Sequence, residues 1–149
     1  MRGFIYTIEK QRFWMMGGAR SIDITDGLFD KEDPLLKEKI LDLKKQGKNY
    51  YRIRGINWFP EEELERGMEC LRKNGMETDY IITHAAPTMV SNYFSAWRFK
   101  ADELTDYFEK IRKEVQFKRW FCGHYHVDEE MVVEGKNFQI LYNKIERIY

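Results

Sequence analysis

Residues 120–126 place two of the chain's three histidines directly after a short apolar run. The run ends at Gly123, and His124 and His126 follow it. An apolar run of this kind, bounded by a glycine, is typical of a buried strand that opens into a loop. Side chains at positions i and i+2 of an extended chain point the same way, so we expect both imidazoles to face one point. Gly123 is expected to turn the backbone tightly before them.

The third histidine, His84, closes another apolar segment, residues 79–83, and Pro87 follows shortly after it. Every histidine therefore lies where a predicted buried strand opens into a loop. Open α/β sheets place their ligands at such strand ends. A lone histidine is more often a core or surface residue than a metal ligand. Three histidines at strand ends instead predict a metal site formed by His84, His124 and His126.

Helical periodicity separates the predicted strands. Apolar residues recur at helical spacing in residues 34–46, 60–73 and 101–115. Asp33 is the expected N-cap of the first of these helices, because Pro34 follows it and proline suits the first helical position. Glycines follow the first two helices, as is usual at helix ends.

The remaining apolar segments are predicted as strands, and the stretches between them as loops. The predicted strands are residues 1–8, 13–18, 79–84, 117–122, 131–133 and 138–142, and residues 50–56 form an aromatic and basic stretch. Residues 19–33, rich in Asp, Thr and Gly, and the Ser-, Asn- and aromatic-rich stretch after Pro87 are predicted loops. Strands with interleaved helices, followed by strands alone, predict an α/β or α+β layered fold with a mixed sheet. We expect one domain over residues 1–149.

Composition narrows the function classes. Lys and Arg together number 25, as do Asp and Glu, so no net charge favours nucleic acid or a membrane surface. A hydrophobic fraction of 43% is enough for a real core, and no apolar span of about 18 residues predicts a membrane helix. The two cysteines do not form a disulfide framework, which makes the cytoplasm the expected compartment.

Several blocks resemble a known family. Thr83 and His84 with Pro87, followed by the block at residues 123–126, resemble the C-terminal part of the calcineurin-like metallophosphoesterase superfamily. Further blocks are similar, in order, to a bacterial and phage-type branch of it: residues 17–23, 51–53, 58–62, 79–87, 104–106 and 117–126. The resemblance covers nearly the whole chain. It implies part of a β-sandwich with flanking helices, and an enzyme that hydrolyses phosphate mono- or diesters.

The resemblance also implies the metal chemistry. Family members hold divalent ions of the Mn, Fe or Zn type as a pair, which activate a hydroxide for in-line attack on phosphorus. By resemblance His84 and His124 would bind one ion and His126 the other. The family's Asp-x-His, Gly-Asp and Gly-Asn-His blocks are absent, so no catalytic residue is assigned. The chain is therefore expected to be truncated relative to the family, and to hold fewer ions, or none, by itself.

Other polar residues have two interpretations each. Arg20 and Arg54 are candidate contacts for substrate phosphate, because guanidinium binds phosphoryl oxygens well, but surface or loop-bracing roles fit equally. Asp23 and Asp26 suit outer-shell partners of a metal histidine, or loop caps. Cys122 suits a Cys/His/His zinc site, although a strand cysteine is usually core.

Two further functions compete with the phosphoesterase. The first is a non-catalytic remnant or subunit that binds a partner supplying the missing half, either a complementing N-terminal chain or a second copy in a homodimer. The second is a hydrolase with a single metal held by three histidines and a water. The expected partner of the enzyme is a phosphate-ester substrate. Neither nucleic acid nor a membrane is indicated.

Overall fold

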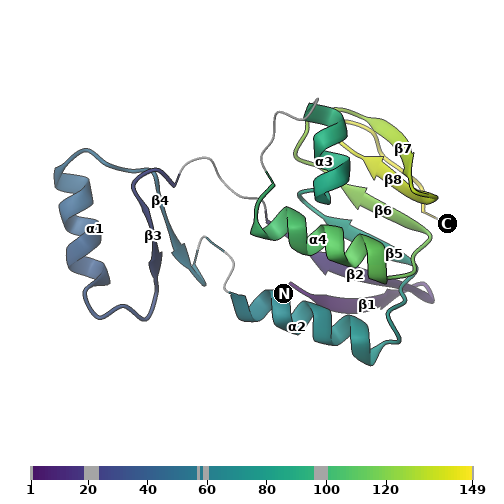
Figure 1. Ribbon diagram of the computed structural model, residues 1–149, viewed down its shortest axis with the longest axis horizontal. Helices are drawn as coiled ribbons and strands as arrows, with labels where there is room; N and C mark the ends of the chain where they lie inside the picture. Colours follow the sequence, from purple (N-terminus) through teal and green to yellow (C-terminus); the bar gives the residue numbers. More distant parts are fainter. Residues whose placement is uncertain (1, 19–23, 57, 59–60, 96–100, 149) are drawn as a thin grey trace. The chain divides into compact units, whose positions relative to one another are not determined.

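The computed structural model describes residues 2–18, 24–56, 58, 61–95 and 101–148. Its contacts divide the chain into two units, one formed by Met1–Ala19 with Glu63–Tyr149 and the other by Arg20–Glu62 (Figure 1). This division into two units does not test whether residues 1–149 form one domain, which stays a prediction. Within the described ranges, every helix is too short or too polar to cross a bilayer.

The larger unit is built on a six-stranded mixed sheet with the order β1-β2-β5-β6-β8-β7. Strands β2, β5, β6 and β8 run parallel, and the edge strands β1 and β7 pair antiparallel with β2 and β8. The strands are β1 (Phe4–Ile8), β2 (Gln11–Met16), β5 (Tyr80–Thr83), β6 (Arg119–Cys122), β7 (Glu129–Val133) and β8 (Lys136–Ile140). The predicted α/β class with a mixed sheet is confirmed.

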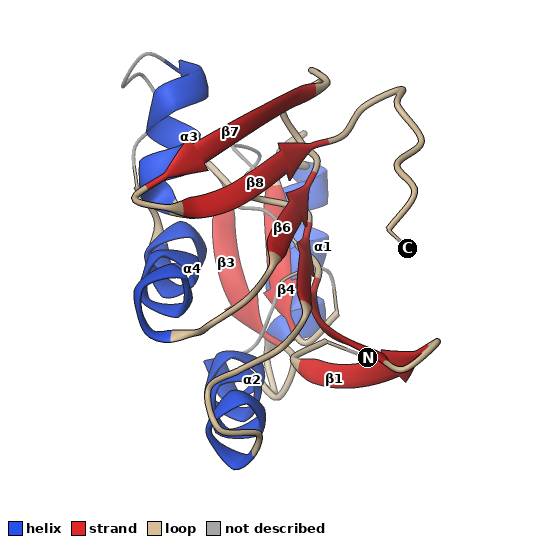
Figure 2. Ribbon diagram, turned by 90° about the vertical axis from the view of Figure 1, so that its right-hand side faces the viewer, coloured by secondary structure: helices blue, strands red, loops and turns tan. Residues whose placement is uncertain are grey.

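One face of this sheet carries the core. Trp14, Ile81, Trp120 and Phe138 are at most 1% exposed and come from four adjacent strands. Helices α2 (Glu61–Lys73), α3 (Thr88–Ser95) and α4 (Glu103–Glu114) lie on that face (Figure 2). Fully burying each such side chain contributes about 1.5–3 kcal/mol.

Helix α4 begins at a capping box. Asp102 accepts the backbone N–H groups of Leu104 at 2.9 Å and Thr105 at 3.0 Å. Thr105 Oγ1 accepts the backbone N–H of Asp102 in return at 3.0 Å. These reciprocal bonds satisfy donors that the first turn of a helix leaves unpaired. The predicted helix over residues 101–115 is thus present with a slightly later start.

Helix α2 approaches the sheet closely because of a glycine. A Cβ at Gly67 would lie 2.7 Å from Tyr107 Oη and 3.2 Å from Trp14 Cζ2. The Trp14 indole N–H donates to the Gly67 carbonyl at 3.3 Å. Only a residue without a Cβ allows this helix to pack so near to β2 and α4.

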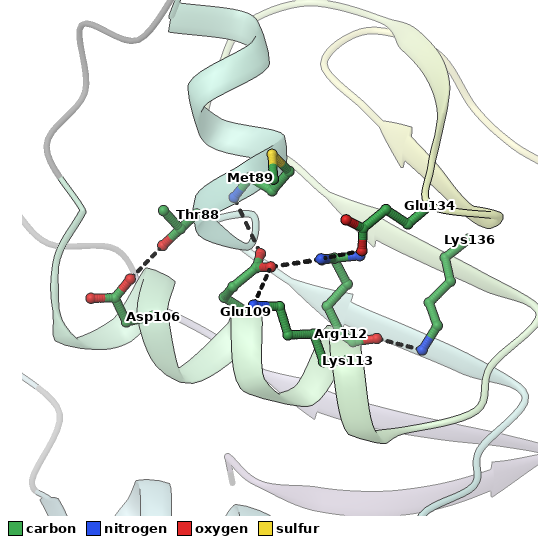
Figure 3. A network of polar contacts seen from close by, with 8 residues as sticks. All are labelled: Thr88, Met89, Asp106, Glu109, Arg112, Lys113, Glu134 and Lys136. Carbon is green, nitrogen blue, oxygen red and sulfur yellow. Dashed lines mark hydrogen bonds and ion pairs between the residues drawn. The ribbon is translucent and has the colours of Figure 1, made fainter.

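Helix α3 corrects the predicted loop after Pro87. Its first turn is held by carboxylates of α4: Thr88 Oγ1 donates to Asp106 at 2.8 Å, and the Met89 N–H donates to Glu109 at 3.2 Å (Figure 3). Negative groups at a helix N-terminus stabilise it. The local composition indicated a loop, and partners distant in the sequence made it a helix.

Arg112 ties the same network to the β7–β8 hairpin (Figure 3). Its guanidinium is 1% exposed and binds Glu109 at 2.7 Å and Glu134 at 2.9 Å. Burial alone would raise the pKa of Glu109, but the bonds from Arg112 and from the Met89 N–H outweigh burial and lower that pKa. Lys136 donates to the carbonyl of Val115 at 2.7 Å, so the hairpin is held at the end of α4.

The smaller unit is a β-α-β arrangement. Strands β3 (Gly27–Asp30) and β4 (Tyr51–Arg54) are parallel and are joined by α1 (Leu36–Lys45). Strand β3 lies within the predicted loop at residues 19–33, and that prediction was wrong. The pairing of β3 with β4, more than twenty residues away, forms a strand where the local composition favoured a turn.

Asp33 does not cap α1. The N-cap is Leu35, with no side-chain cap bond. Asp33 instead accepts the N–H of Leu35 at 2.9 Å and the ammonium of Lys39 at 2.6 Å. The bond from i+2 is an Asx-turn, which carries the chain through Pro34 before the helix starts. The other predicted helices and strands are present with shifted ends.

Candidate functional site

Two of the predicted ligands follow adjacent parallel strands of the larger unit. Strand β5 ends at Thr83, immediately before His84, and β6 ends at Cys122, shortly before His124. The Gly123 N–H donates to the His84 carbonyl at 3.1 Å, so the strand pairing continues into the loops. The carboxyl ends of parallel strands are the usual ligand-binding edge of an α/β sheet. The predicted placement of these histidines at strand ends is confirmed.

The His84 and His124 imidazoles lie against each other. His124 Nδ1 is 3.2 Å from His84 Nε2, and the ring centroids are 5.0 Å apart. A separation of this size fits an N–H···N hydrogen bond. It also fits two ligands of one ion, because ligands at about 2.0–2.1 Å in a tetrahedral array have nitrogens about 3.3 Å apart. The pair therefore has the spacing of two neighbouring metal ligands.

The backbone of this loop is not extended. The expectation that His124 and His126 point the same way, as side chains two residues apart in a strand do, was therefore wrong. His124 has φ of 75° and His126 has φ of 54°, both in the left-handed region. The φ angle of Gly123 is not positive. A Cβ at this position would lie 3.6 Å from the Leu141 carbonyl oxygen and 3.8 Å from His84 Nδ1, which are ordinary contact distances. Non-glycine residues in this region cost about 1–3 kcal/mol each and cluster at functional sites. The histidines themselves make the turn that was expected of the glycine.

His126 has a different neighbour. Its ring stacks on Tyr142, with centroids 4.8 Å apart and planes at 23°. Among the residues that the structure describes, no group of three or more His, Cys, Asp or Glu side chains is arranged to hold a metal. The structure thus brings two of the three predicted ligands together. The role of His126 as a ligand stays a prediction.

The direction of the His124 pKa shift suits metal binding. Burial, followed by repulsion from His84 and His126, lowers the pKa of His124, while the carboxylate of Asp102 opposes this shift. A lowered pKa favours the neutral imidazole near pH 7. Metal binding requires the neutral form, because a protonated nitrogen has no lone pair for the ion.

Asp102 and Tyr125 are site neighbours that the sequence did not reveal. Asp102 is the N-cap of α4, and its charge acts on both His124 and Tyr125. The hydroxyl of Tyr125 accepts the N–H of Ala86, two residues after His84, at 3.1 Å. Asp102 had the signal of a helix cap, but its proximity to the histidines depends on how α4 packs.

Cys122 belongs to the core. It is 3% exposed, and burial raises the pKa of its thiol to about 12. A metal-binding cysteine needs the thiolate, which this burial disfavours strongly. The structure therefore supports the core interpretation of Cys122 over the Cys/His/His zinc site.

The remaining candidates lie in the smaller unit or outside the described residues. Arg20 and Asp23 lie outside the described residues. Arg54 is the last residue of β4 and is half-buried, and its contact with substrate phosphate stays a prediction. Asp26 accepts the N–H of Tyr50 at 2.9 Å, which is the loop-capping role.

Comparison of the chain with family models, curated proteins and solved structures found no match.

Proposed function

We propose that this chain binds a divalent metal ion through His84 and His124 and that its reaction is the hydrolysis of phosphate mono- or diesters. The 3.2 Å spacing between His124 Nδ1 and His84 Nε2 is the observation that carries the metal site. The proposal of a phosphate-ester substrate rests on the sequence blocks that resemble the metallophosphoesterase superfamily. The described residues fit a metal ion only in part, because they supply two histidine ligands and no group of three or more.

The chain's own groups have clear tasks in this proposal. His84 and His124 present ring nitrogens 3.2 Å apart from the ends of two adjacent parallel strands. Burial, followed by repulsion from His84 and His126, lowers the pKa of His124 and so favours its neutral form. When bound, an ion of the Mn, Fe or Zn type acts as a Lewis acid on phosphoryl oxygens and lowers the pKa of water.

Calorimetric titration with Zn²⁺ and Mn²⁺ tests the metal site. We expect binding by the native chain, and loss of binding in His84→Gln and His124→Gln. Gln116→Ala is the matched control, because Gln116 is exposed and lies at the opposite end of the sheet. Native-like affinity in both histidine variants would refute the site.

Turnover tests the substrate class. With added Mn²⁺, the chain by itself should hydrolyse a generic aryl phosphate diester only slightly above the metal blank, because a pair of ligands holds at most part of a two-metal centre. Any activity above the blank should vanish in His124→Ala. Robust turnover that survives this substitution would contradict the assignment of His124. A cytoplasmic location belongs to the same proposal.

A second candidate function is that of a subunit completed by another chain. The helices of the larger unit lie on one face of the sheet, and residues 141–148 run along the other (Figure 2). On that second face Met15, Tyr80 and Ile82 are half-buried, whereas Phe13 and Phe121 are buried, and Tyr80 Oη donates to the carbonyl of Ile148 at 3.2 Å. Such a face and the strand edges suit added strands from a complementing chain or a second copy.

Light scattering at several concentrations tests this second function. Self-association, or stabilisation by an added partner chain, is the expected result. A monodisperse monomer with a cooperative thermal transition would show that the chain closes its own core and needs no partner strands.

A further inference from the structure

Tyr125, between the two loop histidines, makes a ring of hydrogen bonds with the loop that follows His84. The Ala86 N–H donates to Tyr125 Oη at 3.1 Å. Tyr125 Oη and Ser91 Oγ are 2.5 Å apart. Ser91 Oγ donates to the Ala86 carbonyl at 3.2 Å.

The donors in this ring can be assigned by counting protons. The Ser91 hydroxyl has one proton, and the Ala86 carbonyl can only accept, so Ser91 donates to Ala86. The proton between the two hydroxyls must then come from Tyr125. The Tyr125 oxygen also accepts the Ala86 N–H, and each donor in the ring has an acceptor. Hydrogen bonds arranged in such a chain polarise and strengthen one another.

The ring is shielded from water. Ala86 is 0% exposed and Ser91 5% exposed, and the Phe94 ring stacks on Tyr125 with centroids 5.5 Å apart. A partly buried ring of this kind favours one arrangement of its members, because opening it leaves the buried Ser91 and Ala86 groups unpaired.

The ring links the two loops that carry the imidazole pair. Ala86 is two residues after His84, and Tyr125 is the residue next to His124. The strand pairing contributes one further bond, between the Gly123 N–H and the His84 carbonyl. The left-handed backbone at His124 and His126 persists only where surrounding contacts over-determine it. The ring supplies such contacts on the side of the loop facing α3.

We propose that Tyr125 and Ser91 are positioning residues that hold the His84 and His124 nitrogens at the spacing of metal ligands. This role rests on the proposed function for its metal readout, and it extends that function to two residues that do not touch the ion. Loss of an outer-shell partner typically weakens metal binding about 10–100-fold. A purely structural role would lower stability and leave the affinity of the folded protein unchanged.

Three variants of the full chain test the role. Tyr125→Phe removes the hydroxyl and keeps the ring that stacks on Phe94. Ser91→Ala removes the neighbouring hydroxyl. Tyr93→Phe is the matched control on the same helix, because Tyr93 is 65% exposed. Circular dichroism confirms folding, titration calorimetry measures Zn²⁺ affinity, and NMR records the contact between the His84 and His124 ring protons in metal-free protein.

In folded protein we expect Tyr125→Phe and Ser91→Ala each to weaken Zn²⁺ binding by up to about tenfold, the lower end of the range for direct partners of a ligand, because these hydroxyls bond the Ala86 backbone and each other. The double variant should be little weaker than either single variant, because both open the same ring. Tyr93→Phe should bind as the native chain does. Native affinity in folded Tyr125→Phe and Ser91→Ala would overturn the proposal, and so would unfolding of both, which would assign the ring to the fold as a whole. If one variant unfolds, the other decides.

The metal-free NMR contact separates this inference from the proposed function. If the native chain binds no Zn²⁺, the proposed metal site fails, and the imidazole contact still tests the positioning role. Its loss in Tyr125→Phe or Ser91→Ala supports that role. Its retention in both overturns it.

Discussion

The two ends of the parallel strands in the larger unit differ sharply in how their polar groups are used. At the amino ends, Asp79 accepts the N–H of Arg12 at 2.7 Å and pairs with Lys118 at 2.8 Å. The buried hydroxyl of Thr78 donates to the Arg12 carbonyl at 2.9 Å. At the carboxyl ends, His84 and His124 face each other and the backbone of His124 is left-handed.

This difference separates an end held by an ion pair and backbone hydrogen bonds from an end where two imidazoles lie against each other. Asp79 joins β2, β5 and the start of β6 through opposite charges and direct hydrogen bonds. The histidine end brings together groups that repel when protonated, whereas left-handed non-glycine backbone occurs at both ends, at Lys10 and Met76 as well as at His124. Strain of that kind persists only when the surrounding structure determines the conformation. We infer that the hydrogen bonds joining Tyr125, Ser91 and Ala86, together with the core, keep the carboxyl end in its left-handed form.

The largest expected effect is on metal binding at the carboxyl end. His84→Ala should weaken Zn²⁺ binding by more than about 100-fold, because even outer-shell changes cost 10–100-fold. The side chain is exposed, so the free energy of unfolding should change by less than about 0.5 kcal/mol. Calorimetry and chemical denaturation measure the two quantities. A large loss of stability would show that this end also holds the fold together.

A substitution at the amino end should lower stability and leave Zn²⁺ affinity nearly unchanged. Asp79→Ala should lower the free energy of unfolding by about 2 kcal/mol, because it removes a carboxylate that accepts a backbone N–H and pairs with a lysine. Zn²⁺ affinity should stay within about twofold of the native value. Glu77→Ala is the control. Its carboxylate is 67% exposed and 3.8 Å from Arg12, so it should matter little.

The backbone strain can be measured with a matched pair of variants. His124→Gly and His124→Ala both remove the imidazole, but only glycine adopts a φ of 75° without steric cost. His124→Gly should therefore unfold with a free energy about 1 kcal/mol higher than His124→Ala. Equal stabilities in denaturant titrations would show that the loop is not strained at this position.

The smallest expected effect is the pH dependence of the amino end. The hydrogen bond from Lys118, followed by the Arg12 N–H, lowers the pKa of Asp79 from its ordinary 3.8. Its contribution to stability is therefore present above pH 3.8 and is lost as the pH falls through the lowered value. In acid denaturation, Asp79→Asn should lose less stability over this range than the native chain. If the two proteins lose stability identically in acid, Asp79 does not contribute to the acid sensitivity of the native chain.

The sequence by itself determined the elements that carry their own signals. Residues 60–73 and 101–115 have helical periodicity with end signals, and helices lie there because local spacing alone decides which face is apolar. The same logic placed each histidine just beyond a predicted strand. The mixed α/β class followed from the order of these elements.

Other elements and contacts formed only because folding brought residues together that are distant in the sequence. Strand β3 exists through its pairing with β4, and α3 through carboxylates of α4, and neither partner is near in sequence. The left-handed loop at His124, the stacking of His126 on Tyr142 and the ring through Tyr125 depend on side chains that folding brings together. Local composition cannot encode such contacts, because their free energy arises only when both partners are in place.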